Sequence, residues 1–370
     1  MENLNANNGA VLPYMDYLLL SKHPEARFII YPIYGLITIT GLIGNFLVLF
    51  IIFRNKAMRT ITNTFIANLS VSDILIAAIT TPFTPLSQDH QLFTINKTMC
   101  HLLPFTMCMT VYVSTLTSTA IAADRFFVIV HPFVPRMKNW LCCLIIFIIW
   151  LVAVLISLPL GVYQGSGDKE SNRTNCYENW PKNSYSTEVF SLLSFLLQFI
   201  VPCSIITYCY IKISLLVKSR YKNKLEGRPS KCREEYEISR KHKTNFMLIM
   251  MVVIFVICWI PLNILWNICD WVIEDHKKGS SKQTDWFQIT FFFCHILAMS
   301  SAVYNPFLYA YMNENFKKEF RRILPCLFSR SNQRSARRST MVVESMAMLP
   351  SPNNVNNNNN NGNGNTTNKS

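Results

Sequence analysis

The chain has 370 residues, of which 50% are hydrophobic and only 15% are charged. This composition is too apolar for an ordinary soluble protein of this length, so it indicates a membrane protein. The net charge of +14 would fit a nucleic-acid-binding protein, but the basic residues gather in a few loops between apolar runs. We therefore expect no nucleic-acid partner.

Seven apolar runs are long enough to cross a bilayer, which takes about 20 mostly apolar residues per helix. They are Phe28–Phe53, Ile61–Leu86, Met99–Val130, Trp140–Val162, Val189–Val217, Phe246–Val272 and Trp286–Met312. A single span satisfies its own backbone hydrogen bonds only as a helix. The sequence thus predicts an all-α membrane protein, with a seven-transmembrane helix bundle over residues 28–312.

The basic residues predict the orientation of this bundle, because Lys and Arg are in excess in cytoplasmic loops. They are concentrated after the first run, in the third internal loop from Lys218 to Lys243, and after the seventh run. These three places lie on one side if seven helices alternate in direction. We therefore predict a multi-pass plasma-membrane protein with an extracellular N-terminal tail, residues 1–27, and a disordered cytoplasmic tail, residues 327–370.

Asp73 lies inside the second run, where an ionised carboxylate is costly. One interpretation is a protonated, hydrogen-bonded carboxyl group. The interpretation that we favour is a cation site or protonation switch, in which oxygens of Ser114, Ser301 and Asn305 help Asp73 to hold a sodium ion. Apart from this structural sodium ion, the sequence predicts no metal and no cofactor.

Asp124 and Arg125 stand at the end of the third run, where a charge pair needs a reason. Arg125 could simply reach for lipid phosphate at the membrane surface, or it could act with Asp124 in a switch. Proline inside a helix frees a backbone carbonyl and makes a kink. Because Pro202, Pro261 and Pro306 fall in the last three runs, we interpret the bundle as one that changes shape.

Of the twelve cysteines, Cys100 and Cys176 fall in segments predicted to face the oxidising outer side, so we expect a disulfide between them. Cys269 and Cys294 are a weaker candidate for a second bridge. Asn172 begins an Asn-Arg-Thr sequon in the same outer loop and is the predicted glycosylation site. A second sequon, at Asn96, lies so close to the membrane that we expect it to be unused.

The stretch Glu314–Leu324 follows the seventh run and repeats apolar residues at helical spacing, with Lys and Arg opposite. This pattern predicts a short amphipathic helix, within residues 313–326, that lies on the inner membrane surface and contacts lipid. Cys326 would then be placed for palmitoylation. The Ser- and Arg-rich stretch 329–340 predicts a kinase substrate.

Taken together, these positions resemble those of the rhodopsin-like (class A) G-protein-coupled receptors. The resemblance covers Phe28 to Cys326 and rests on Asn45, Leu69–Asp73, Cys100, Asp124-Arg125, Trp150, Pro202, Tyr210, the FVICWIP stretch from Phe255 to Pro261, and Asn305–Tyr309. Two positions depart from the family pattern, since Phe126 replaces a usual Tyr and Ser301 replaces a frequent Asn. The acid–base pair before Phe126 is kept, so we expect coupling to survive.

Within this class the chain resembles receptors for neuropeptide Y, neuropeptide F and short neuropeptide F. The residues that carry this likeness are the CHLLP stretch from Cys100 to Pro104, the run VYVSTLTSTAIAADRFFVIVHPF, Gln198, Asp270-Trp271, His295, and the HPFVPRMK stretch from His131 to Lys138. Met107 stands where neuropeptide Y receptors have Gln and receptors for biogenic amines have Asp. A small amine ligand is therefore disfavoured.

The resemblance implies a neuropeptide ligand that ends in an Arg-aromatic-amide. Asp270 would pair with the ligand arginine, in a charge-assisted contact that is strong when partly desolvated; the alternative is a solvated loop acid. The cavity for the last ring would be lined by Gln198, Met107, Trp266 and His295, with Trp259 at its floor.

The resemblance also implies signalling through a heterotrimeric G protein of the Gi/Go class, which lowers cyclic AMP. Helix six would swing outward about Pro261, so that Arg125 leaves Asp124 and lines a cytoplasmic cleft with Tyr210 and Tyr309. The Asn305-Pro306 pair would serve as a hinge of helix seven. Receptor kinases and arrestin would bind through the tail.

Three alternatives remain at this point. A secondary transporter is disfavoured because the seven runs do not divide into repeated halves. An enzyme is disfavoured because no nucleophile–base set, acid pair or metal-ligand cluster is evident. Within the receptor class, the ligand could instead be another RFamide peptide, of the prolactin-releasing-peptide type.

Overall fold

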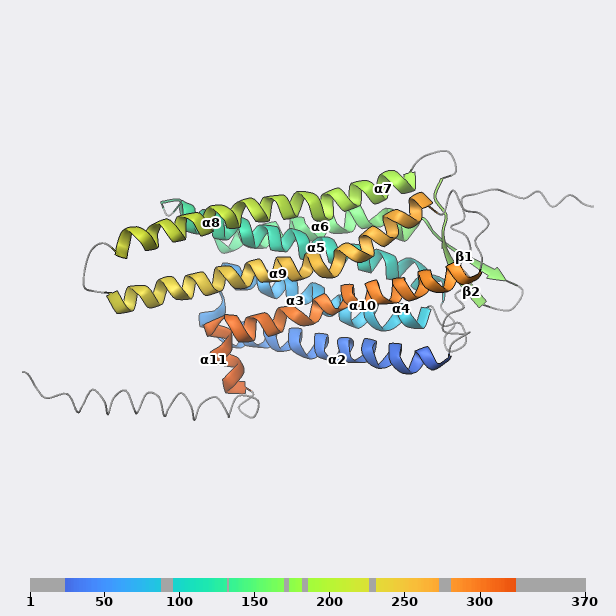
Figure 1. The fold of residues 1–370 in the computed structure, drawn as a ribbon, viewed down its shortest axis with the longest axis horizontal. Helices are drawn as coiled ribbons and strands as arrows, with labels where there is room; N and C mark the ends of the chain where they lie inside the picture. The colour runs from blue at the N-terminus through green and yellow to red at the C-terminus, as the bar shows by residue number, and fades with distance from the viewer. Residues whose placement is uncertain are drawn as a thin grey trace, which may run out of the picture. The chain divides into compact units, whose positions relative to one another are not determined.

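A computed structural model describes residues 24–87, 96–131, 133–169, 173–181, 186–225, 231–272 and 281–323. Within these residues, seven helical segments are long and apolar enough to cross a membrane, as predicted. The spans are Pro24–Arg54, Ile61–Ser87, Lys97–Val130, Asn139–Val162, Val189–Leu216, Asn245–Ile268 and Phe287–Met312. They lie side by side (Figure 1). The predicted runs differ from these spans by at most a few residues.

Several spans belong to longer helices. The elements are α2 (Pro24–Arg54), the short η1 (Lys56–Met58), α3 (Ile61–Leu75), η2 (Ile76–Thr80), α4 (Thr81–Ser87), α5 (Lys97–Val130), α6 (Asn139–Val162), α7 (Ser186–Phe195), η3 (Leu196–Ile200), α8 (Val201–Leu225), α9 (Lys231–Val272), α10 (Ser281–Met312) and α11 (Glu314–Ile323). The predicted amphipathic helix is α11, and its ten residues are a shorter stretch than 313–326. The chain divides into two compact units at Lys317.

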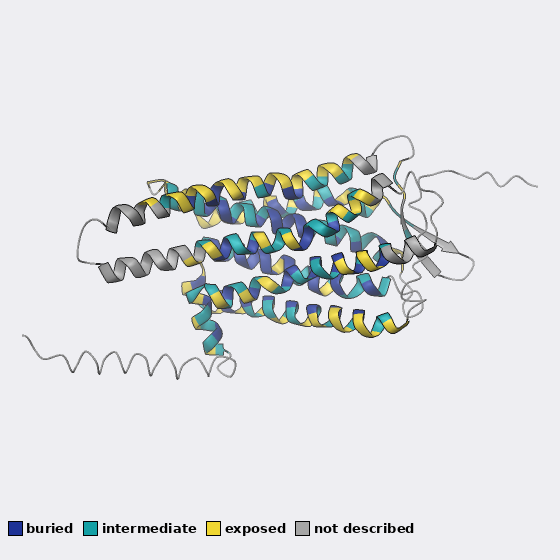
Figure 2. Ribbon diagram, viewed as in Figure 1, coloured by how far each residue is buried: buried dark blue, intermediate teal, exposed yellow. Residues whose placement is uncertain are grey.

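The bundle exposes many large apolar side chains on its outer surface and buries a number of polar ones. Figure 2 shows exposed residues along the outer faces of the helices and buried residues along the faces that meet. Leu36 and Phe46 of α2 are exposed, whereas Asn45 of the same helix and Asp73 of α3 are buried. Lipid is the solvent that such a surface fits, because the hydrocarbon core of a bilayer is as apolar as these side chains.

Two widened helical turns, which were not predicted from the sequence, each precede a proline. In η3, the N–H of Val201 donates to the carbonyl of Leu196, five residues earlier, and Pro202 follows at once. A proline ring clashes with the carbonyl four residues before it, and a widened turn relieves that clash. The turn η2 stands in the same relation to Pro82. The turn η3 also contains Gln198.

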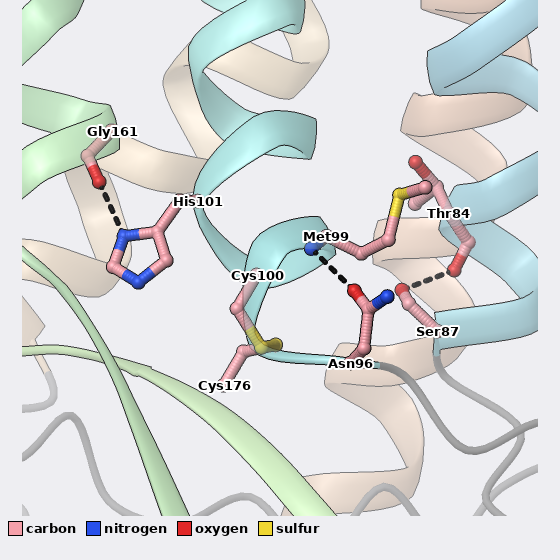
Figure 3. Close-up of a disulfide and its surroundings, with 8 residues drawn as sticks. All are labelled: Thr84, Ser87, Asn96, Met99, Cys100, His101, Gly161 and Cys176. Atoms are coloured by element: carbon pink, nitrogen blue, oxygen red, sulfur yellow. Dashed lines mark hydrogen bonds between the residues drawn. A yellow bond between two sulfur atoms is a disulfide. The ribbon is translucent and has the colours of Figure 1, made fainter.

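The segment between α6 and α7 contains a β-hairpin, which the all-helical prediction missed. Strands β1 (Gln164–Lys169) and β2 (Arg173–Glu178) pair antiparallel. The predicted disulfide joins Cys176 of β2 to Cys100 in the first turn of α5, with their Cα atoms 5.3 Å apart. Figure 3 shows how this bridge fastens the hairpin to the helix end.

The start of α5 is held by further bonds next to the disulfide. The Asn96 side-chain oxygen accepts from the N–H of Met99 at 3.0 Å and caps the helix. The His101 ring donates from Nδ1 to the carbonyl of Gly161 in α6 at 2.7 Å (Figure 3). The Asn96 cap and the contact between His101 and Gly161 thus fix the first turn of α5 beside the disulfide.

Candidate ligand-binding and switch sites

Trp259 of α9 lies at the centre of the bundle, within an aromatic row. Its ring centroid is 5.9 Å from that of Phe255, which stacks at 6.1 Å on Phe199 of η3. The indole N–H donates to Ser301 Oγ of α10 at 3.0 Å. Trp259 is thereby joined to α10 by a hydrogen bond and to η3 through ring contacts. A movement of α9, α10 or η3 would therefore change the contacts of this side chain.

Two other predicted ligand residues border this centre. Met107 of α5 is half-buried and packs against the apolar cluster that contains Trp259 and Phe199. Gln198 of η3 is buried. Its side-chain amide carries two hydrogen-bond donors and an acceptor, which are the groups that a polar ligand needs.

His295 of α10 is fully buried and joins α10 to α2. Its Nδ1 lies 2.8 Å from the hydroxyl oxygen of Tyr34, and its ring centroid is 5.5 Å from that of Phe291. Phe291 in turn meets Trp266 of α9 edge-on at 5.9 Å. Two predicted cavity residues, His295 and Trp266, are thus connected through a third aromatic ring.

The predicted anchor for the ligand arginine is not tested by the structure. The backbone of α9 continues through Asp270, about 16 Å along the helix from Trp259, but the Asp270 side chain lies outside the described residues. Asn172 and Cys326 also lie outside them. The weaker disulfide candidate is not formed, because Cys294 is a free, buried cysteine.

The predicted sodium ligands are only partly brought together. Asp73 Oδ2 accepts from Asn305 Nδ2 at 2.8 Å. Ser114 instead shares a hydrogen bond with Ser72 at 3.1 Å, and Ser301 accepts from Trp259. The carboxylate and amide oxygens suit a hard cation, and each serine oxygen keeps a lone pair to offer. The residues present therefore fit a sodium ion, which stays a prediction.

Near the end of α5 that is far from Cys100, Asp124 and Arg125 share one hydrogen-bond partner, Thr62 of α3. Arg125 Nε lies 3.9 Å from Asp124 Oδ2. Thr62 donates from Oγ1 to the same carboxylate oxygen at 3.2 Å and accepts from the Arg125 guanidinium. The arrangement favours the switch interpretation over snorkelling, because Arg125 is bonded within the protein.

Tyr210 of α8 is buried and borders a groove of about 430 Å³ between α8 and α9. The groove is lined by Ile206, Thr207, Tyr210, Ile211, Ser214, Leu215, Ile249, Val252 and Val253. Tyr309 of α10 is fully buried and stacks on Phe316 of α11, with ring centroids 5.4 Å apart.

Comparison with known proteins places this geometry in a family. The family described as "7 transmembrane receptor (rhodopsin family)" matches residues 44–309. The chain is 33% identical over 313 residues to neuropeptide Y receptor type 2 of Bos taurus, covering 83% of the chain and 78% of that receptor. It is 32% identical over 321 residues to each of the receptors of the same name from Macaca mulatta and Mus musculus, covering 85% of the chain and 81% of each relative.

The chain belongs to the rhodopsin family of seven-transmembrane receptors. It is therefore a membrane-spanning, G-protein-coupled receptor. Its candidate site residues form two separate groups along the bundle. The group around Trp259 and His295 lies toward the disulfide. The group around Arg125 lies about 37 Å along α5 from Cys100, at the other membrane face.

Two residues of the receptor's polar network were missed from the sequence. Tyr34 lies in an apolar run and looks like any lipid-facing or core aromatic, and Thr62 looks like a residue of the first turn of a helix. No spacing rule within a single helix marks either one, because their partners are on other helices. Their burial beside His295 and Asp124 identifies them only in the folded bundle.

Proposed function

We propose that this receptor binds a neuropeptide that ends in an Arg-aromatic-amide and signals through Gi/Go to lower cyclic AMP. The observation that carries the proposal is the similarity to neuropeptide Y receptors over most of the chain, together with the polar groups at the outer half of the bundle. Gln198 and His295 are both buried, and Nε2 of His295 has no hydrogen-bond partner within the described residues.

The chemistry of such a ligand matches what these residues offer. A terminal amide needs hydrogen-bond partners inside a poorly hydrated cavity, which the Gln198 amide and the His295 ring supply. The last aromatic ring needs an apolar surface, which Met107 and Trp259 supply. The ligand arginine needs a carboxylate, and Asp270 is the acid at the outer end of α9.

The peptide would act by binding two receptor conformations with different affinity, since a ligand shifts only an equilibrium that it binds unequally. In our proposal the favoured conformation has α9 swung outward about Pro261. Arg125 then leaves Asp124 and Thr62 and, with Tyr210 and Tyr309, lines a cleft for the G protein. The orientation follows from the basic loops, with the N-terminus outside and the C-terminus cytoplasmic. The tail would bind arrestin and receptor kinases.

Cyclic-AMP inhibition in cells that express the receptor tests the proposal directly. A panel of RF-amide and RY-amide peptides is applied, together with the same peptides as free acids and with the penultimate Arg replaced by citrulline. We expect at least one amidated peptide to lower cyclic AMP. Both altered forms should lose most of their potency.

The variant Asp270→Ala should lose potency for the intact peptide while responding to the citrulline peptide as the wild type does. Asp285→Ala removes an acidic residue between the predicted sixth and seventh runs and serves as the matched control. The G-protein class is decided separately, by nucleotide exchange on purified Gi, Gs and Gq heterotrimers. If no peptide acts on receptor that reaches the cell surface, the ligand class is wrong. An RFamide peptide of the prolactin-releasing-peptide type that acts alone would select that alternative.

A further inference from the structure

The hydrogen bond between Tyr34 and His295 is a buried link between two helices. The Tyr34 side chain of α2 is 2% exposed and His295 of α10 is 0% exposed. Their oxygen and Nδ1 are 2.8 Å apart, and the ring centroids are 5.7 Å apart. The second ring nitrogen of His295, Nε2, is buried and has no hydrogen-bond partner within the described residues.

The direction of this hydrogen bond decides which nitrogen of the His295 imidazole carries a hydrogen. If Tyr34 donates to Nδ1, the neutral ring carries its own hydrogen on Nε2, and only that N–H lacks a partner. If Nδ1–H donates to Tyr34, both the phenolic hydrogen and the lone pair on Nε2 lack partners. A doubly protonated ring would add an unpaired buried charge to these deficits. Since unpaired buried polar groups cost free energy, the first arrangement is favoured.

We infer that Tyr34 is a positioning residue that holds His295 as the Nε2–H tautomer, so that His295 presents a hydrogen-bond donor to an acceptor oxygen of the ligand. The acceptor class is a carbonyl oxygen, such as that of a C-terminal amide. This inference rests on the proposed function for the identity of the ligand, but the tautomer is a property of the receptor alone. Phe291, the other ring beside His295, offers no acceptor oxygen.

The tautomer can be read from the ligand-free receptor by ¹⁵N NMR after selective labelling of its seven histidines. His295→Gln assigns the resonance. We expect Nε2 to be the protonated nitrogen in the wild type and Nδ1 to be unprotonated. Tyr34→Phe should move the Nδ1 resonance, because that nitrogen loses its donor. Tyr304→Phe, a change on α10 at a residue that is 39% exposed, is the matched control and should leave the resonance in place. A wild-type spectrum with hydrogen on Nδ1 would overturn the inference.

Peptide binding then tests the consequence. Tyr34→Phe should weaken binding of an active amidated peptide by about tenfold, with an unchanged number of sites. In a His295→Ala background the same change should have no further effect, because the residue that it positions is gone. Equal losses in both backgrounds would show that Tyr34 acts independently and would contradict the inference. If no amidated peptide binds, the proposed function fails, while the NMR spectrum still decides the tautomer.

Discussion

Asn45 of α2 donates a hydrogen bond of 2.8 Å to the backbone carbonyl of Ala302 in α10. Ala302 stands four residues before Pro306, so its carbonyl has lost the N–H that a regular helix would supply. The same Asn45 amide also donates to the carbonyl of Gly41 at 2.9 Å. Asn45 thus supplies the hydrogen-bond donor that Pro306 lacks, and it joins α2 to the predicted hinge of α10.

Asn45→Ala should therefore destabilise the bundle by about 1–3 kcal/mol, because the Ala302 carbonyl would be left buried and unpaired. The measurement is the melting temperature of the purified receptor in detergent. Thr40→Val is the control, since Thr40 bonds only to carbonyls of its own helix and should change the melting temperature little. Equal shifts for both variants would argue against a special role for the contact with Ala302.

Gly44 permits the same two helices to approach closely. A Cβ atom placed on Gly44 would lie 2.9 Å from Cγ of Pro306, and one placed on Gly35 would meet nothing within 4 Å. The proline ring cannot yield as a flexible side chain would. Gly44→Ala should force α2 and α10 apart and reduce both thermal stability and surface expression, whereas Gly35→Ala on the same helix should be neutral. Normal expression and stability of Gly44→Ala would show that α10 can shift without cost.

The membrane spans were predictable because hydropathy alone defines them, whereas parts of the helices outside the membrane were not. The apolar run predicted for the sixth span begins at Phe246, yet α9 begins at Lys231. Its first residues are charged, good helix formers that a search for apolar runs cannot register. The hairpin at Cys176 was missed for a related reason, since neither of its strands has an alternating apolar pattern.

The candidate site was predictable only as a set of residue types. Asp73, Trp259 and Asn305 stand out because polar or bulky groups at membrane depth need partners. Which partner each one takes depends on how the helices are rotated in the bundle. The sequence therefore suggested a sodium ligand at Ser301, and the structure adds that this hydroxyl accepts the Trp259 N–H.

A sodium ion at Asp73 would couple to ligand binding if it prefers one receptor conformation. We expect replacement of choline by sodium at equal ionic strength to lower the affinity of the wild type for an activating peptide by about fivefold. Asp73→Asn should abolish this dependence, because it removes the charge but keeps an oxygen that can accept from Asn305. Radioligand competition measures both. An equal sodium effect in the variant would exclude Asp73 as the ligand of the ion.

Thr62 should restrain the receptor in the conformation described here. Its hydroxyl donates to Asp124 and accepts from Arg125, so it holds in place the arginine that we propose to line the G-protein cleft. Thr62→Val keeps the shape of the side chain and removes both bonds. A loss of about 1 kcal/mol from the resting conformation would raise ligand-independent activity by about fivefold.

Nucleotide exchange on a purified G protein, without peptide, measures this basal activity. Thr64→Val is the matched control, because Thr64 lies one half-turn further along α3 and bonds only to the carbonyl of Thr60 at 3.1 Å. We expect the control to keep the basal rate of the wild type. If the Thr62→Val receptor folds and keeps the basal exchange rate of the wild type, then the bond between Thr62 and Arg125 does not restrain Arg125. The restraint would then have to come from Asp124 alone.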